Sequence, residues 1–232
     1  MGKIYTALGL MTGTSMDGVD VSIIKSDGIS HFTNVLDEFY QLSDDLQSRL
    51  FSLRDKILSK ADLIKFLDEI KLLEREITIF HGEVVQDISS KYKENIDLIG
   101  FHGQTIFHDS KIKITKQLGD GNLLSQLTKK IVVYDFRQKD LQNGGQGAPL
   151  TPIFHNMLSN KIFDKKENEI ANIINIGGIT NITLTSNDND KFTKEIKAMD
   201  IAPGNCLIDQ WVRKNSNKKF DKDGLIGKSG KI

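Results

Sequence analysis

Residues 9–20, Gly-Leu-Met-Thr-Gly-Thr-Ser-Met-Asp-Gly-Val-Asp, constrain the fold more than any other part of the chain. An apolar run at 4–10 leads into this stretch, and a run at 19–23 that alternates apolar and polar residues leads out of it. Two such runs on either side of a glycine-rich turn predict a β-hairpin. We therefore expect an antiparallel pair of strands near the amino terminus.

The turn of this predicted hairpin carries groups that can hold an anion. Its two glycines allow positive φ and a close approach of a ligand, so successive N–H groups can point into one concavity. Its hydroxyls add donors, and either of its carboxylates could hold a hydrated divalent cation beside a phosphate. Because glycine, serine and aspartate are also common in turns, a polar turn without a ligand is an equal alternative. The residues concerned are Gly13, Thr14, Ser15, Asp17, Gly18 and Asp20.

Charge and cysteine content narrow the classes of partner. The chain has 31 basic and 31 acidic residues, a balance that favours neither a nucleic-acid groove nor a polybasic membrane patch. Cys206 is the single cysteine, which excludes an internal disulfide and fits a reducing compartment. The start lacks the features of a signal peptide, and no apolar run approaches the ~20 residues that span a bilayer. We expect a soluble cytoplasmic protein.

Apolar periodicity predicts an α/β fold. Residues 41–60 have helical spacing, and apolar residues recur every three or four positions over 61–92, which predicts one long amphipathic helix. Strand and helix patterns then alternate, with Asp120 or Asn122 as the helix cap, and this order favours an α/β sheet. The predicted segments are strands at 96–101 and 112–118, a helix at 123–130 and a buried strand at 131–136.

A polar, charged segment at 161–169 is the expected boundary between two domains, 1–165 and 166–232. Beyond it, two strand patterns flank Gly177 and Gly178 and repeat the design of the opening hairpin. A further strand is expected to end at Met199-Asp200, before a helix that passes through Trp211 and Val212.

Pro149 suits the first turn of a helix that reaches Ser159, which would place the glycines of 144–147 at a helix N-terminus. Polar, glycine-rich loops are thus expected after several strands. In an open α/β sheet such loops gather at one crevice, where ligands bind. They indicate a phosphate or sugar-phosphate site. The loops are 12–18, 102–105, 135–147, 177–181 and 200–205.

Two charged side chains on these loops are candidates for chemistry. Asp200 follows an apolar strand, where a carboxylate can act as a general base; it could equally cap the following helix. Arg137 suits bidentate recognition of a carboxylate or phosphate, and Asp135 could be its structural partner.

The histidines give weaker signals. His102 and Gln104 offer hydrogen bonds to a sugar or a phosphate, although a lone histidine is more often structural. The remaining candidates have no metal-ligand spacing, so we predict no zinc site. They are His31, His81 and His155.

Taken in order, the loop segments resemble the anhydro-N-acetylmuramic acid kinase family. Besides 9–20, they are Gly-Phe-His-Gly-Gln-Thr-Ile (100–106), Asp-Phe-Arg-Gln-Lys-Asp…Gly-Gly-Gln-Gly-Ala-Pro-Leu (135–150), Asn-Ile-Gly-Gly-Ile-Thr-Asn (175–181) and Met-Asp-Ile-Ala-Pro-Gly-Asn (199–205). The resemblance implies an actin/hexokinase-like α/β fold with two RNase H-like lobes and ATP between them. Because family members continue well past this length, it implies a complete first lobe and a partial second lobe.

The resemblance also implies a reaction and its residues. ATP, with Mg²⁺, and water would open the 1,6-anhydro ring of anhydro-N-acetylmuramic acid and give N-acetylmuramic acid 6-phosphate in peptidoglycan recycling. Asp200 would be the base that activates the water, and His102, Gln104 and Arg137 would contact sugar or phosphate. No protein ligand of a metal is implied. The residues implied to bind ATP are Gly13, Thr14, Ser15, Met16, Asp17, Gly18, Val19, Asp20, Gly177 and Gly178.

Alternatives follow from the length of the chain. One is a non-catalytic remnant that binds sugar or phosphate through the first lobe. Another is an interaction module that a partner chain completes. The expected ligands are a small amino sugar and ATP, with no nucleic acid and no membrane, and a homodimer is left open.

Overall fold

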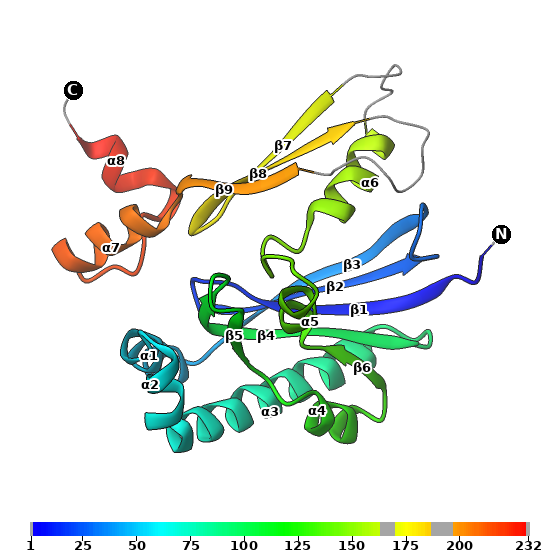
Figure 1. The fold of residues 1–232 in the computed structure, drawn as a ribbon, viewed down its shortest axis with the longest axis horizontal. Helices are drawn as coiled ribbons and strands as arrows, with labels where there is room; N and C mark the ends of the chain where they lie inside the picture. Colours follow the sequence, from blue (N-terminus) through cyan, green and yellow to red (C-terminus); the bar gives the residue numbers. More distant parts are fainter. Residues whose placement is uncertain (1, 163–169, 187–196, 231–232) are drawn as a thin grey trace. The chain divides into compact units, whose positions relative to one another are not determined.

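The computed structural model describes residues 2–162, 170–186 and 197–230, and the chain divides into two compact units, Met1–Ala148 and Pro149–Ile232 (Figure 1). In unit 1 the antiparallel strands β3, β2 and β1 are followed in the sheet by β4, which runs parallel to β1. The far edge of β4 pairs first with β6 in parallel and then with β5 in antiparallel orientation. The strands are β1 (Tyr5–Thr12), β2 (Gly18–Ser26), β3 (Phe32–Gln41), β4 (Leu98–Asp109), β5 (Ile114–Leu118) and β6 (Ile131–Tyr134).

The predicted opening hairpin is confirmed. β1 and β2 pair in continuous antiparallel register from Tyr5 and Ser26 to Met11 and Asp20. Alternate side chains of both strands are buried, as the period of a half-buried strand requires. The buried set is Leu8, Leu10, Val19, Val21 and Ile23.

Helices cover one face of this sheet (Figure 1). Val84, Val85 and Ile88 of α3 join the buried strand residues in a first core cluster. A second core cluster lies under the tip of the hairpin, where Met16 packs with leucines of α1 and isoleucines of α3. The helices of unit 1 are α1 (Asp44–Lys56), α2 (Lys60–Lys65), α3 (Leu67–Lys91), α4 (Gly121–Thr128) and α5 (Phe136–Gln142).

The prediction of one long helix over 61–92 is wrong, because the chain leaves helical geometry at Phe66 (φ −105°, ψ 24°). This break separates α2 from α3 and lets both Leu63 and Phe66 pack against the second core cluster. The amphipathic stripe of α3 itself is as predicted.

The strand expected at 131–136 is shorter and is not buried. β6 ends at Tyr134, and Ile131 and Val133 are 68% and 44% exposed. β6 pairs with β4 along one edge. An edge strand cannot be told from a buried one by its apolar run alone.

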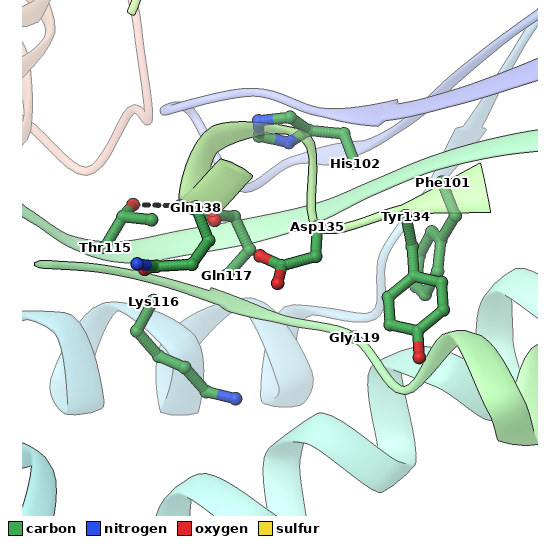
Figure 2. Close-up of a pocket in the computed structure, with 9 residues that line it drawn as sticks. All are labelled: Phe101, His102, Thr115, Lys116, Gln117, Gly119, Tyr134, Asp135 and Gln138. Atoms are coloured by element: carbon green, nitrogen blue, oxygen red, sulfur yellow. Dashed lines mark hydrogen bonds between the residues drawn. The ribbon is translucent and has the colours of Figure 1, made fainter. Parts of the chain in front are cut away.

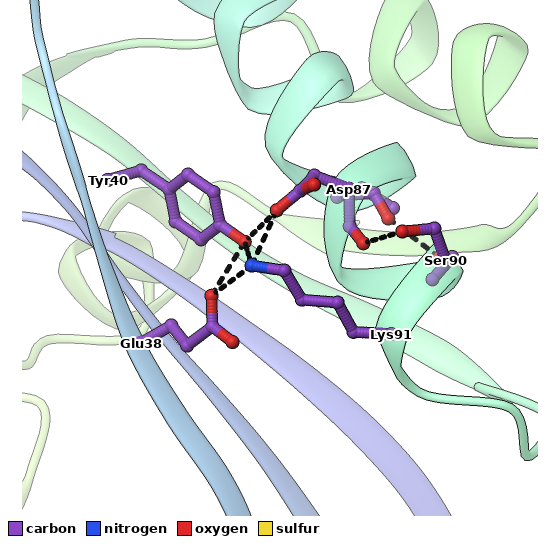
Figure 3. Close-up of polar contacts among 7 residues, drawn as sticks. Glu38, Tyr40, Asp87, Ser90 and Lys91 are labelled. Atoms are coloured by element: carbon purple, nitrogen blue, oxygen red, sulfur yellow. Dashed lines mark hydrogen bonds and ion pairs between the residues drawn. The ribbon is translucent and has the colours of Figure 1, made fainter.

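A polar cluster joins the end of α3 to β3 (Figure 3). Lys91 Nζ donates to Glu38 Oε2 at 2.7 Å and to the Tyr40 hydroxyl at 3.0 Å, and it lies 2.8 Å from Asp87 Oδ2. The same two carboxylates lie within hydrogen-bonding distance of the Tyr40 hydroxyl. These contacts hold the pKa of Lys91 above its usual value, while burial, helped by Asp87, raises the pKa of Tyr40 to about 12.

Unit 2 contains an antiparallel sheet in the order β7, β8, β9. α6 packs on β8 through polar pairs: His155 Nδ1 and Thr183 Oγ1 are 2.8 Å apart, and Thr185 Oγ1 donates to Ser159 Oγ at 2.8 Å. The elements are α6 (Pro152–Ile162), β7 (Ile170–Ile176), β8 (Ile179–Ser186), β9 (Lys197–Pro203), α7 (Cys206–Asn215), η1 (Lys222–Gly224) and α8 (Leu225–Ser229).

The helix expected to begin at Pro149 begins at Pro152 instead. His155 N–H donates to the carbonyl of Thr151 at 2.8 Å, and Pro152 takes the first helical position, where its missing N–H costs nothing. The glycines of 144–147 are therefore not at a helix N-terminus, and the loop expected over 135–147 contains α5.

Candidate functional site

The turn of the β1–β2 hairpin is tight and has an unexpected backbone. Met16 N–H donates to the carbonyl of Gly13 at 3.2 Å. The positive φ expected at Gly13 or Gly18 falls on Met16, with φ 50°. Met16 is fully buried in the second core cluster, whereas Thr14 and Ser15 are exposed. Met16 thus anchors the turn, and the two hydroxyls face outward.

Hydrogen bonds from Gln47 and Leu42 also hold the backbone of the turn. Gln47 Nε2 donates to the carbonyl of Ser15 at 3.3 Å, and Leu42 N–H donates to the carbonyl of Asp17 at 2.8 Å. Gly18 is required by close packing, because a Cβ there would lie 2.4 Å from the Phe39 ring. The turn is therefore fixed before any ligand arrives.

Two carboxylates stand beside the turn. Ser15 Oγ donates to Asp17, and burial, followed by the charge of Asp17, raises the pKa of Asp20. A cation between them would relieve this repulsion. In the described part of the chain no three side chains form a metal cage. Mg²⁺ usually keeps several waters and uses one or two carboxylates plus phosphates, so this pair fits a hydrated ion.

His102 and Gln104 do not lie in a loop, so that expectation is wrong. β4 continues through both to Asp109, because β5 supplies pairing partners from Leu118 onward. Gly103 accommodates this continuation with φ 72°, and a Cβ there would lie 2.3 Å from the carbonyl of Leu118.

The structure brings His102 and Arg137 together. Nδ1 of His102 lies 2.7 Å from the carbonyl of Gly103 and must carry the proton, so Nε2 accepts from Arg137 Nε at 2.9 Å. Burial, with the nearby Arg137 charge, lowers the pKa of His102 to about 4. Arg137 Nη1 also donates to the carbonyl of Gly147 at 2.7 Å. The guanidinium is thus held by a neutral imidazole and a carbonyl.

Gln104 is 1% exposed and is paired with Thr12 across β1 and β4. Its Nε2 donates to the carbonyl of Thr105 at 3.1 Å, while its Oε1 accepts no hydrogen bond from any described residue. A side chain this buried supports the hairpin more readily than it reaches a ligand.

A hollow of about 250 Å³ opens beside His102, and the carboxylate of Asp135 points into it (Figure 2). Asp135 has φ 60°, and burial, partly offset by Lys116, raises its pKa. The sequence grouped Asp135 with Arg137, with a structural partnership as one alternative, and did not indicate Lys116 or Gln138, since nothing in their spacing indicates a common hollow. Its lining is Phe101, His102, Thr115, Lys116, Gln117, Gly119, Tyr134, Asp135 and Gln138.

In unit 2 the glycine turn between β7 and β8 is bonded to the segment after β9. The N–H groups of Gly204 and Asn205 donate to the carbonyls of Gly178 and Gly177 at 2.9 and 2.7 Å. A Cβ at Gly204 would lie 2.2 Å from the Gly177 carbonyl, so only glycine fits this contact. The structure therefore brings together two of the predicted loops.

Asp200 was expected at the end of a strand, but it lies inside β9. It is exposed and stands opposite Asn181 of β8, whose Oδ1 is buried and has no partner among the described residues. The strand continues to Pro203 because β8 offers pairing partners up to Ile179. The alternative role as a helix cap is wrong, since Asn205 occupies the N-cap position of α7.

Comparisons with known proteins agree with the motifs. Residues 5–232 match the family model described as anhydro-N-acetylmuramic acid kinase. Proteins of that name from Pelagibacter ubique (strain HTCC1062) and Agrobacterium fabrum (strain C58 / ATCC 33970) are 50% and 37% identical over 100% of this chain. The aligned region is 60% and 61% of those relatives, so the chain spans about three fifths of their length.

No helix in the described ranges is long and apolar enough to cross a membrane. The mixed sheet of unit 1 and the smaller sheet of unit 2 agree with the actin-like fold of the matching family, which confirms the predicted fold class. Because the family model covers nearly every residue, the chain belongs to the anhydro-N-acetylmuramic acid kinase family.

Proposed function

We propose that this chain carries the phosphate hairpin and the catalytic aspartate of a cytoplasmic sugar kinase of peptidoglycan recycling. The enzyme uses ATP and water to convert 1,6-anhydro-N-acetylmuramic acid to N-acetylmuramic acid 6-phosphate and ADP. The observation that carries the proposal is the turn of the β1–β2 hairpin. Hydrogen bonds from Gln47 and Leu42 fix its backbone, while Thr14 and Ser15 remain exposed. Donors fixed in advance are what phosphoryl transfer requires.

The turn residues act on the phosphates of ATP. Backbone N–H groups and the hydroxyls of Thr14 and Ser15 would donate to phosphate oxygens, and Asp17 and Asp20 would hold a hydrated metal ion. Bound Mg²⁺ supplies charge neutralisation for the phosphates. Gly177 and Gly178 are also proposed to contact ATP.

Asp200 acts as the general base. It accepts a proton from water as the water oxygen bonds to the anomeric carbon, and the bond from that carbon to the bridging oxygen breaks. The bridging oxygen then bonds to the γ-phosphorus, whose bond to the oxygen of ADP breaks. Water must attack from the face opposite the leaving oxygen. Asp200 is exposed on β9, so water can reach its carboxylate.

We propose separate roles for the residues that were expected to contact the sugar. Arg137 keeps its charge and suits an anionic group, such as the carboxylate of the muramic acid side chain. His102 is proposed to hold Arg137 in place, because both of its ring nitrogens have partners within the chain. Asp135 in the hollow can accept hydrogen bonds from sugar hydroxyls.

The test is release of ADP from ATP in the presence of 1,6-anhydro-N-acetylmuramic acid. Asp200→Asn is expected to lower the rate by roughly 10²–10⁴-fold, the usual contribution of a general base. Asp209→Asn, in α7 of the same unit, is the matched control and should keep the parent rate. Equal rates for the two variants would refute the role of Asp200. Binding of Mg·ATP without any sugar-dependent release would support the non-catalytic alternative.

A further inference from the structure

A buried hydrogen bond lies directly before the turn of the β1–β2 hairpin. Thr12 is the last residue of β1, and its Oγ1 lies 3.2 Å from Nε2 of His81 in α3. The exposed fractions of the two residues are 1% and 0%. Neither group can exchange this partner for bulk water, so breaking the bond would leave a buried polar atom unpaired.

The direction of this bond follows from a second contact of the same ring. His81 Nδ1 lies 2.7 Å from the carbonyl of Ile77. A carbonyl can only accept, so Nδ1 carries the proton and Nε2 is a bare acceptor. The Thr12 hydroxyl therefore donates to Nε2. Burial lowers the pKa of His81 to about 4, so the ring stays neutral near pH 7.

The same turn of α3 also supports the far side of the hairpin turn. Ile77 belongs to the second core cluster with Met16. The positive φ of Met16 is unfavourable for a residue with a side chain and persists only where the surroundings fix it. α3 thus holds the turn at two points, through Thr12 on one side and Met16 on the other.

We propose that His81 is a positioning residue of the phosphate hairpin: by accepting from Thr12, it fixes the N–H groups of residues 13–15 in the direction that the phosphates of ATP require. The identity of the ligand rests on the proposed function. The positioning itself rests only on the contacts of Thr12, His81 and Met16. Sequence reasoning assigned His81 no role, because the contact joins segments far apart in the chain.

Paired substitutions separate this role from general packing. His81→Gln puts an acceptor near the position of Nε2, whereas His81→Asn can keep only the donor to Ile77. Thr12→Ser keeps the hydroxyl, and Thr12→Val removes it while preserving the shape. Should the His81 variants fold poorly, the Thr12 pair carries the same test.

The first measurement is amide hydrogen exchange at Met16, with Ile23 in β2 as the reference for the core. His81→Asn and Thr12→Val are expected to speed exchange at Met16 about tenfold relative to Ile23, equivalent to ~1.4 kcal/mol. His81→Gln and Thr12→Ser should retain the parent ratio. Equal acceleration of exchange at Met16 and Ile23 would overturn the proposal. The same exchange ratio in both His81 variants and in both Thr12 variants would overturn it as well.

The second measurement is the Kd of Mg·ATP for the same chains. The two variants that speed exchange at Met16 should bind about tenfold more weakly, and the two conservative variants should bind like the parent. If the parent binds no Mg·ATP, the proposed function fails, while the exchange ratios still decide whether His81 positions the hairpin.

Discussion

Arg137 donates a hydrogen bond from Nε to Nε2 of His102 across 2.9 Å, and this bond requires a neutral imidazole and fixes the orientation of the guanidinium. The imidazole must be neutral to accept, and burial together with the guanidinium charge lowers its pKa to about 4. His102 therefore acts as a fixed acceptor near neutral pH, and Arg137 keeps its charge in a defined orientation.

Unit 1 is expected to lose stability in mild acid. The pKa values of His81 and His102 fall from 6.5 to about 4 on folding, mainly through burial. The unfolded chain binds these protons at a higher pH than the folded chain does. The free energy of unfolding is therefore unaffected above about pH 6.5 and decreases as the pH falls toward 4. For fully buried His81 the loss is about 3 kcal/mol. Urea unfolding across this range should show a shallower pH dependence in His81→Gln and in His102→Gln; unchanged slopes would contradict the account.

Gly18→Ala should destabilise unit 1 by about 1–3 kcal/mol, because the added methyl would meet the Phe39 ring and the Tyr40 carbonyl, each at 2.4 Å. Gly13→Ala is the control, since the nearest atom to a Cβ there is Ser15 Oγ at 3.7 Å and its φ is not positive. It should change stability by no more than about 0.5 kcal/mol. Thermal unfolding of the two variants compares them, and equal destabilisation would mean that packing at Gly18 is not limiting.

Lys91→Met should destabilise the joint between α3 and β3, because Glu38, Asp87 and the Tyr40 hydroxyl lose their shared cation. The group is partly exposed, so high salt should reduce the difference from the parent. Lys71→Met, at an exposed position of the same helix, is the matched control. Urea midpoints at low and high salt test this; a difference that salt does not change would rule out the electrostatic cause.

Asp120→Ala should cost about 1 kcal/mol by removing the N-cap of α4, where its carboxylate accepts from Leu123 N–H at 2.9 Å. The sequence left Asp120 and Asn122 as equal candidates, and the structure selects the first. Asn122→Ala is therefore the control and should be close to neutral in thermal unfolding. The reverse order of the two variants would contradict the assignment.

Local patterns were enough to predict the elements whose boundaries are set by adjacent residues. Alternating apolar residues around glycine turns predicted both the β1–β2 and the β7–β8 hairpins, because the turn and the pairing lie within one short segment. The stripe of α3 was predicted for the same reason.

Boundaries that depend on distant pairing were missed. β4 runs through His102 and Gln104 because it pairs with β5, and β9 runs through Asp200 because it pairs with β8. Both segments contain polar or glycine residues that resemble a loop when read alone. The Thr12–His81 and His102–Arg137 contacts were missed likewise, since each joins residues far apart in the sequence.

The central claim is that Asp200 activates water for attack on the anomeric carbon while ATP phosphorylates the bridging oxygen. The most direct test runs the reaction in ¹⁸O-labelled water and locates the label by mass spectrometry, with unlabelled product incubated in the same water as the control for exchange. We predict one label on the anomeric carbon, none in the phosphate group, and roughly 10²–10⁴-fold slower product formation with Asp200→Asn. Label in the phosphate group, release of labelled inorganic phosphate without a sugar product, or an unchanged rate with Asp200→Asn would contradict the account.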